Sequence, residues 1–72
     1  MATKFTKEEA ANFARISAEM QVDQLGEYKD ESEAWASGRD NVEDTLPIDV
    51  VRVGYDVYDE TFKKLTGYDA WA

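Results

Sequence analysis

The side chains that could act on a ligand in this chain are mainly carboxylates. Its 72 residues include sixteen Asp and Glu, eight Lys and Arg, no His and no Cys, and the net charge is −8. The lack of His and Cys excludes disulfides, thiol nucleophiles, thiolate or imidazole metal sites and histidine-based acid–base catalysis. Carboxylates alone need an enclosed cleft to shift their pKa values, and a chain of this length rarely encloses one. We therefore expect a protein that is not an enzyme and that binds no cofactor and no metal ion.

The negative charge is concentrated in the middle of the chain. Residues 19–60 contain thirteen acids and three bases, a net charge of −10, whereas the segments 1–18 and 61–72 each carry +1. This balance argues against direct binding to nucleic acid or to an anionic membrane, because both require Lys and Arg. Two interpretations of the acidity stay open. It keeps the protein soluble, or it attracts a basic protein, for example one with a nucleic-acid-binding groove.

Four acids form the densest cluster, between residues 27 and 33, and only Lys29 offsets them. An aromatic residue follows directly, and aromatic side chains beside charged ones are typical anchors in protein interfaces. We predict that the partner-binding residues are Glu27, Asp30, Glu31, Glu33 and Trp35. The alternative is that this segment is an ordinary solvated helix and loop.

Helices must position these side chains, and the first helix has clear start signals. Thr6 and Glu9 have the spacing of a capping box, in which each side chain accepts a hydrogen bond from the other residue's backbone. Downstream, apolar residues recur at helical spacing on one side and charged residues on the other. The pattern predicts an amphipathic helix from about Lys7 to about Gln24.

A second long helix is predicted between Pro47 and Gly67. Proline suits the first turn of a helix, and Lys63 and Lys64 suit its last turn. The apolar residues are spaced alternately three and four apart, as in a heptad seam; they are Ile48, Val51, Tyr55, Tyr58, Phe62 and Leu65. A strand near residues 50–58 is the alternative, because apolar and polar residues alternate there.

Between these helices, Asp30 or Ser32 could cap a short acidic helix that Gly38 would end. We therefore expect one domain over residues 1–72 with an all-α fold. It is a small bundle of two long antiparallel helices with a short acidic helix between them. The alternative fold is α+β, with the strand near 50–58.

A second apolar stripe on the later helix has no assigned neighbour. A helix that is apolar on two sides is normally packed on both, and the segment 34–36 could cover the second side. The other candidate is a second copy of the chain, because so short a chain buries little surface and gains from oligomerisation. In this homodimer hypothesis the self-association residues are Val50, Val53 and Val57.

The N-terminal residues contain no apolar segment of the signal-peptide type, and no long apolar run occurs elsewhere. We therefore expect a cytoplasmic protein. Our leading hypothesis is an acidic binding protein that occupies a basic surface of a larger protein. A phage-type inhibitor of host nucleic-acid machinery, anti-CRISPR-like or DNA-mimicking, fits this profile and would act in the host cytoplasm. The alternative is a small self-associating structural module.

Overall fold

The computed structural model describes residues 5–71, which fold into three α-helices and one 3₁₀ helix. They are α1 (Lys7–Asp23), η1 (Leu25–Glu27), α2 (Glu31–Thr45) and α3 (Val51–Thr66). Each pair of α-helices is in contact, and the described residues contain no strand. The predicted all-α bundle is therefore confirmed. None of the described helices is both long and apolar enough to cross a membrane.

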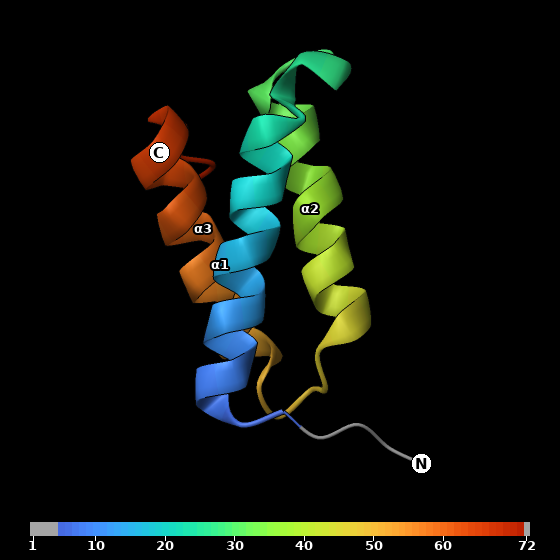
Figure 1. The fold of residues 1–72 in the computed structure, drawn as a ribbon, viewed down its shortest axis with the longest axis vertical. Helices are drawn as coiled ribbons and strands as arrows, with labels where there is room; N and C mark the ends of the chain where they lie inside the picture. Colours follow the sequence, from blue (N-terminus) through green and yellow to red (C-terminus); the bar gives the residue numbers. More distant parts are fainter. Residues whose placement is uncertain (1–4, 72) are drawn as a thin grey trace.

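The middle helix differs from the prediction in length. α2 has 15 residues and continues past Gly38 to Thr45. Because it is nearly as long as its neighbours, it returns the chain to the end where α1 began, and α3 then runs in the same direction as α1 (Figure 1). The two helices predicted to be antiparallel are thus parallel, with α2 antiparallel to both.

Gly38 does not end α2, because it keeps a helical backbone and lies buried in the bundle. A Cβ atom at this position would occupy the space of the Tyr58 hydroxyl and of the Gln21 side chain. The glycine therefore allows the other two helices to approach α2 closely. Its role is packing between helices, which the short-helix prediction did not include.

The end signals at Thr6, Asp30 and Gly67 act as predicted, whereas Pro47 lies in a turn before α3 and not in its first helical turn. The Thr6 hydroxyl accepts from the N–H of Glu9 at 3.0 Å, and the Glu9 carboxylate accepts from the N–H of Thr6 at 2.9 Å, which closes the capping box. Asp30 caps α2 by accepting from the N–H of Glu33 at 2.9 Å. At the end of α3, Gly67 has a φ of 81°, in the left-handed region that favours glycine.

α3 begins at Val51, and the alternative strand near 50–58 is wrong. The Pro47 carbonyl accepts from the N–H groups of Val50 and Val51 at 3.0 and 2.9 Å, so a turn precedes the helix. A strand here would have no partner among the described residues, and its backbone N–H and C=O groups would stay unpaired. The helix satisfies those groups within its own segment.

The core lies where the three helices meet, and the fully buried residues that α1 contributes to it are all small, although Phe13 and Val22 pack against its edge. The buried residues of α1 are Ala10, Ala14, Ser17 and Ala18. The largest fully buried side chains come from the other helices, Tyr58 and Phe62 from α3 and Val42 from α2. Because small side chains shorten the distance between packed helices, α1 can lie close to these large groups.

The buried face of α3 lies between the two apolar stripes predicted from sequence. Its buried members recur every four residues and are Val50, Gly54, Tyr58 and Phe62. Ile48 and Leu65, at the ends of the predicted seam, are instead 92% and 50% exposed. Ile48 lies in the turn before α3, outside the helix, and the buried Gly54 adds nothing to a hydropathy pattern, so the seam did not reveal the buried face. The Leu46 and Val42 side chains occupy the space that a Cβ at Gly54 would take.

Candidate functional site

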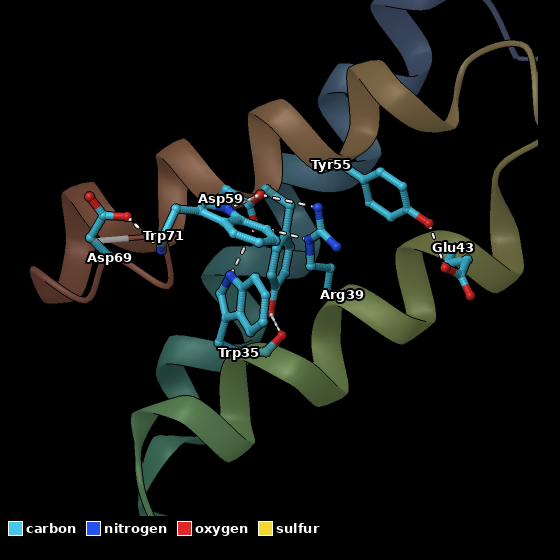
Figure 2. Close-up of polar contacts among 8 residues, drawn as sticks. Trp35, Arg39, Glu43, Tyr55, Asp59, Asp69 and Trp71 are labelled. Atoms are coloured by element: carbon cyan, nitrogen blue, oxygen red, sulfur yellow. Dashed lines mark hydrogen bonds and ion pairs between the residues drawn. The ribbon is translucent and has the colours of Figure 1, made fainter.

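The Asp59 carboxylate of α3 accepts hydrogen bonds from three side chains of α2 and the C-terminal segment (Figure 2). The indole Nε1 of Trp35 donates to Oδ1 of Asp59 at 2.9 Å, and Nε1 of Trp71 donates to Oδ2 at 3.1 Å. Arg39 donates through Nε to Oδ1 at 3.2 Å and through Nη2 to Oδ2 at 3.4 Å. We call these four residues the Asp59 cluster.

Aromatic rings surround the guanidinium of Arg39. Its Cζ lies 4.1 Å from the ring centroid of Tyr55 and 5.2 Å from those of Trp35 and Trp71. These distances suit cation–π attraction. The Arg39 and Asp59 side chains are 25% and 18% exposed. The positive charge of Arg39 is therefore neutralised between α2 and α3 and adds little to the outer surface of α2.

The segment after Gly67 folds back over this cluster. The Tyr68 ring packs edge-on against Phe62, with centroids 6.0 Å apart. The Asp69 carboxylate accepts from the N–H of Trp71 at 3.0 Å and pairs with Lys63 Nζ at 3.2 Å. The Trp71 N–H and then the Lys63 ammonium hold the pKa of Asp69 below its usual value. The segment is thus tied to α3 by an ion pair as well as by packing.

Two interior polar side chains bond to carbonyls of α2. The Tyr58 hydroxyl donates to the Trp35 carbonyl at 2.9 Å, and Gln21 Nε2 donates to the Ala34 carbonyl at 2.8 Å. Burial, followed by the nearby Asp59 charge, raises the pKa of Tyr58 well above its usual value. No buried side-chain nitrogen or oxygen in the part of the chain that the structure describes lacks a partner. The interior is therefore satisfied internally and holds its phenol in the neutral form.

The four acids predicted as partner-binding lie around the start of α2. Glu27 is exposed in η1, Glu31 is half-buried, and Asp30 is the N-cap. Glu33 is exposed, and its Oε1 accepts from the N–H of Lys29 at 3.4 Å. Negative charge is favoured at a helix N-terminus. Two of these acids, Asp30 and Glu33, therefore stabilise the start of α2 in addition to any role toward a partner.

Trp35, the fifth predicted binding residue, points elsewhere. It lies about 160° around the helix from Glu33, is half-buried, and faces α3, where Asp59 accepts its N–H (Figure 2). The structure therefore separates the predicted aromatic anchor from the acidic cluster. The exposed tryptophan in this region is Trp71, at 67%.

The length of α2 brings further acids into line with Glu33. Glu33, Asp40 and Asp44 lie within about 40° of one another around the helix axis, and all three are exposed. With Asp30 at the helix start, they form what we call the acidic face. The ion pairs among residues 5–71 are Arg15–Glu19, Arg39–Asp59 and Lys63–Asp69, and none includes this face. The outward side of α2 is therefore negative and uncompensated.

The stripe predicted for self-association is mostly used inside the bundle. Val50 is 5% exposed and belongs to the core. Val53 and Val57 are half-buried, and Val57 lines a hollow between α1 and α3 together with Ala11 and Arg15. These valines therefore do not form a continuous apolar surface that a second copy could cover.

No group of three His, Cys, Asp or Glu side chains within residues 5–71 is placed to hold a metal ion. Comparison of the chain with protein-family models, curated proteins and solved structures finds no match.

Sequence reasoning missed the Asp59 cluster. The three donor residues lie 12 to 24 positions from Asp59 in the chain, so no local spacing links them to this carboxylate. The only available signal was compositional: a base and several aromatic residues within helices that had to pack together. The extent of the acidic face was missed for a different reason. Asp40 and Asp44 fall after Gly38, where the predicted short helix had already ended.

Proposed function

We propose that this chain is a non-enzymatic acidic protein that binds a basic surface of a larger protein through the acidic face of α2. The observation that supports this function is the one-sided charge of that helix. Asp30, Glu33, Asp40 and Asp44 are exposed without an ion-pair partner in the described structure, whereas Arg39, the one base of α2, pairs with Asp59 toward α3.

A regular element holds these carboxylates at fixed spacings. With a rise of 1.5 Å per residue, Glu33 and Asp40 are separated by about 10 Å along α2, and Asp40 and Asp44 by about 6 Å. These carboxylates are sparser than the charges of duplex DNA, about one per 1.7 Å of axis, so they would engage only some of the Lys and Arg in a groove that binds nucleic acid. Occupation of such a groove would block nucleic acid, which is the action of a phage-type inhibitor of host nucleic-acid machinery.

The test compares two variants with the same change in net charge. The acidic-face variant is Glu33→Gln, Asp40→Asn, Asp44→Asn, which leaves the cap residue Asp30 unchanged. The control variant is Asp23→Asn, Asp49→Asn, Glu60→Gln, three exposed acids outside α2 whose side chains form no hydrogen bond or ion pair within the described residues. Proteins retained by the immobilised chain from a bacterial lysate are identified, purified and titrated with the wild type and both variants.

We expect the acidic-face variant to bind about tenfold more weakly and the control variant to bind nearly as the wild type. Exposed ion pairs contribute about 0.2–1 kcal/mol each, so the loss of three corresponds to about tenfold in affinity. Binding should also weaken steeply with salt, and duplex DNA should compete for the partner. Equal weakening by the two variants would show that net charge alone matters and would refute a specific acidic face.

A further inference from the structure

An exposed isoleucine borders an apolar hollow at the turn between α2 and α3. Ile48 is 92% exposed, more than any other of the exposed large hydrophobic side chains in the described residues. The hollow has a volume of about 320 Å³ and is lined by Glu43, Leu46, Ile48, Val51 and Tyr55. A protruding apolar group and an apolar depression therefore lie next to each other on one surface.

The two sides of this surface carry opposite charges. Glu43 stands on the α2 side, where its carboxylate accepts from the Tyr55 hydroxyl. Arg52 stands on the α3 side and lines an adjoining hollow that shares Ile48 and Tyr55 with the first. A two-fold rotation that places one such surface against another brings Arg52 of each copy toward Glu43 of the other. In a two-fold interface the same patch must complement itself, and this arrangement does.

The base on this surface also favours a second copy as the occupant. The two hollows are lined by two acids, Glu43 and Asp56, and by Arg52, while the charge of the fourth ionised group, Arg39, is already paired with Asp59. The chain as a whole carries −8, so two copies repel each other over most of their surfaces. They can approach with less repulsion where the exposed base Arg52 of one copy meets an acid of the other.

We propose that the chain forms a homodimer in which Ile48 of each copy inserts into the hollow of the other. Only eight residues line the two hollows, whereas standard interfaces use about 20–30 residues a side. The dimer is therefore weak, with a dissociation constant in the micromolar range or above. It leaves the acidic face free, because that face lies on the side of α2 that points away from α3. The dimer and the proposed function can accordingly fail independently.

Sedimentation equilibrium of the full chain, from about 10 µM to about 1 mM, tests this proposal. The mass should rise from the 8.2 kDa of the monomer toward twice that value. Ile48→Glu should weaken dimerisation by about tenfold or more while the circular dichroism spectrum stays helical, since this side chain contributes almost nothing to the core. The matched control is Met20→Glu, which changes another exposed apolar residue, at 54%, on α1, and it should dimerise as the wild type does.

A charge exchange tests the two-fold geometry. Arg52→Glu and Glu43→Arg should each weaken the dimer, and the double variant should recover it, because the pair is then restored in reverse. A chain that stays at 8.2 kDa at every concentration overturns the proposal. Dimerisation of Ile48→Glu with wild-type affinity, or a double variant weaker than both single variants, overturns it as well.

Discussion

The Asp59 carboxylate of α3 and the Arg39 guanidinium of α2 are paired across the two helices, with 3.2 Å from Nε to Oδ1. Both side chains are largely withdrawn from solvent, and the two indole N–H groups of Trp35 and Trp71 complete the set of donors to the carboxylate. One acidic side chain thus connects three segments of the chain: α2, α3 and the residues after Gly67. Its removal would leave a part-buried cation uncompensated, which costs more than the loss of an exposed pair.

Asp59→Asn should lower the free energy of unfolding by about 1–3 kcal/mol, because the amide cannot accept from all the donors that now converge on the carboxylate. Urea unfolding followed by circular dichroism measures the change. Asp56→Asn, an exposed carboxylate on the same helix, is the control and should be nearly neutral. If both variants unfold at the same urea concentration, Asp59 does not connect the helices as described.

Gly38→Ala should destabilise the bundle by about 1–3 kcal/mol, although alanine is the better helix former. The reason is the Tyr58 hydroxyl, which lies where the new Cβ would stand. The cost should be smaller in a Tyr58→Phe background, which a double-mutant cycle measures. Gly26→Ala is the control, since its Cβ would meet no atom within 4 Å. A Gly38→Ala variant as stable as the wild type would contradict the close packing.

Ala14→Leu should destabilise the fold by about 1–3 kcal/mol, because the fully buried Ala14 lies on the small-residue face of α1. Thermal unfolding gives the readout. Ala36→Leu, at an exposed position of α2, makes the same chemical change without entering the core and should leave the melting temperature nearly unchanged. An equal melting temperature for both variants would show that the core beside Ala14 can accommodate a larger side chain, which would contradict the close packing of α1.

Stability should decline in alkaline solution as the pH rises above about 10. The folded state raises the pKa of Tyr58 above its ordinary value of 10.0, chiefly through burial. A raised pKa contributes stability that is complete below the unfolded value and is lost as the pH passes from that value to the folded one. Tyr55, whose pKa the bond to Glu43 raises, acts in the same direction, whereas the Ser37 hydroxyl lowers the pKa of Tyr28.

Tyr58→Phe separates the contribution of Tyr58 from those of the other phenols. Urea midpoints measured from pH 8 upward should fall less steeply in this variant than in the wild type. The buried phenyl ring remains, so the variant should still fold. An unchanged slope would assign the alkaline loss to other groups.

Structural features that depend on residues close together in the chain could be predicted from the sequence. The capping box at Thr6, the cap at Asp30 and the glycine that ends α3 were all predicted, because each bond joins residues only a few positions apart. The class of fold followed from the apolar spacing. The direction of α3 relative to α1 did not, because it depends on the length of α2, and Gly38 was interpreted as a helix end.

Contacts between side chains of different helices could not be predicted from the spacing of residues along the chain. Helical spacing would pair Asp59 with Lys63, four residues later, yet Asp59 pairs with Arg39 and Lys63 pairs with Asp69. Predicting these two ion pairs requires knowing which sides of α2 and of the C-terminal segment face α3. The acidic face was predicted in part, since the residues near Asp30 were identified, while Asp40 and Asp44 lie after Gly38, where the predicted short helix ended.

The inward position of Arg39 also has a kinetic consequence. With its one base turned toward α3, α2 presents negative charge alone to the solution, while bases such as Arg15 and Lys64 lie on other helices. Such a molecule has an electric dipole, and the field of a cationic partner would rotate it before the surfaces touch. α2 would then face the partner at first contact. This orientation raises the fraction of encounters that lead to binding at low ionic strength.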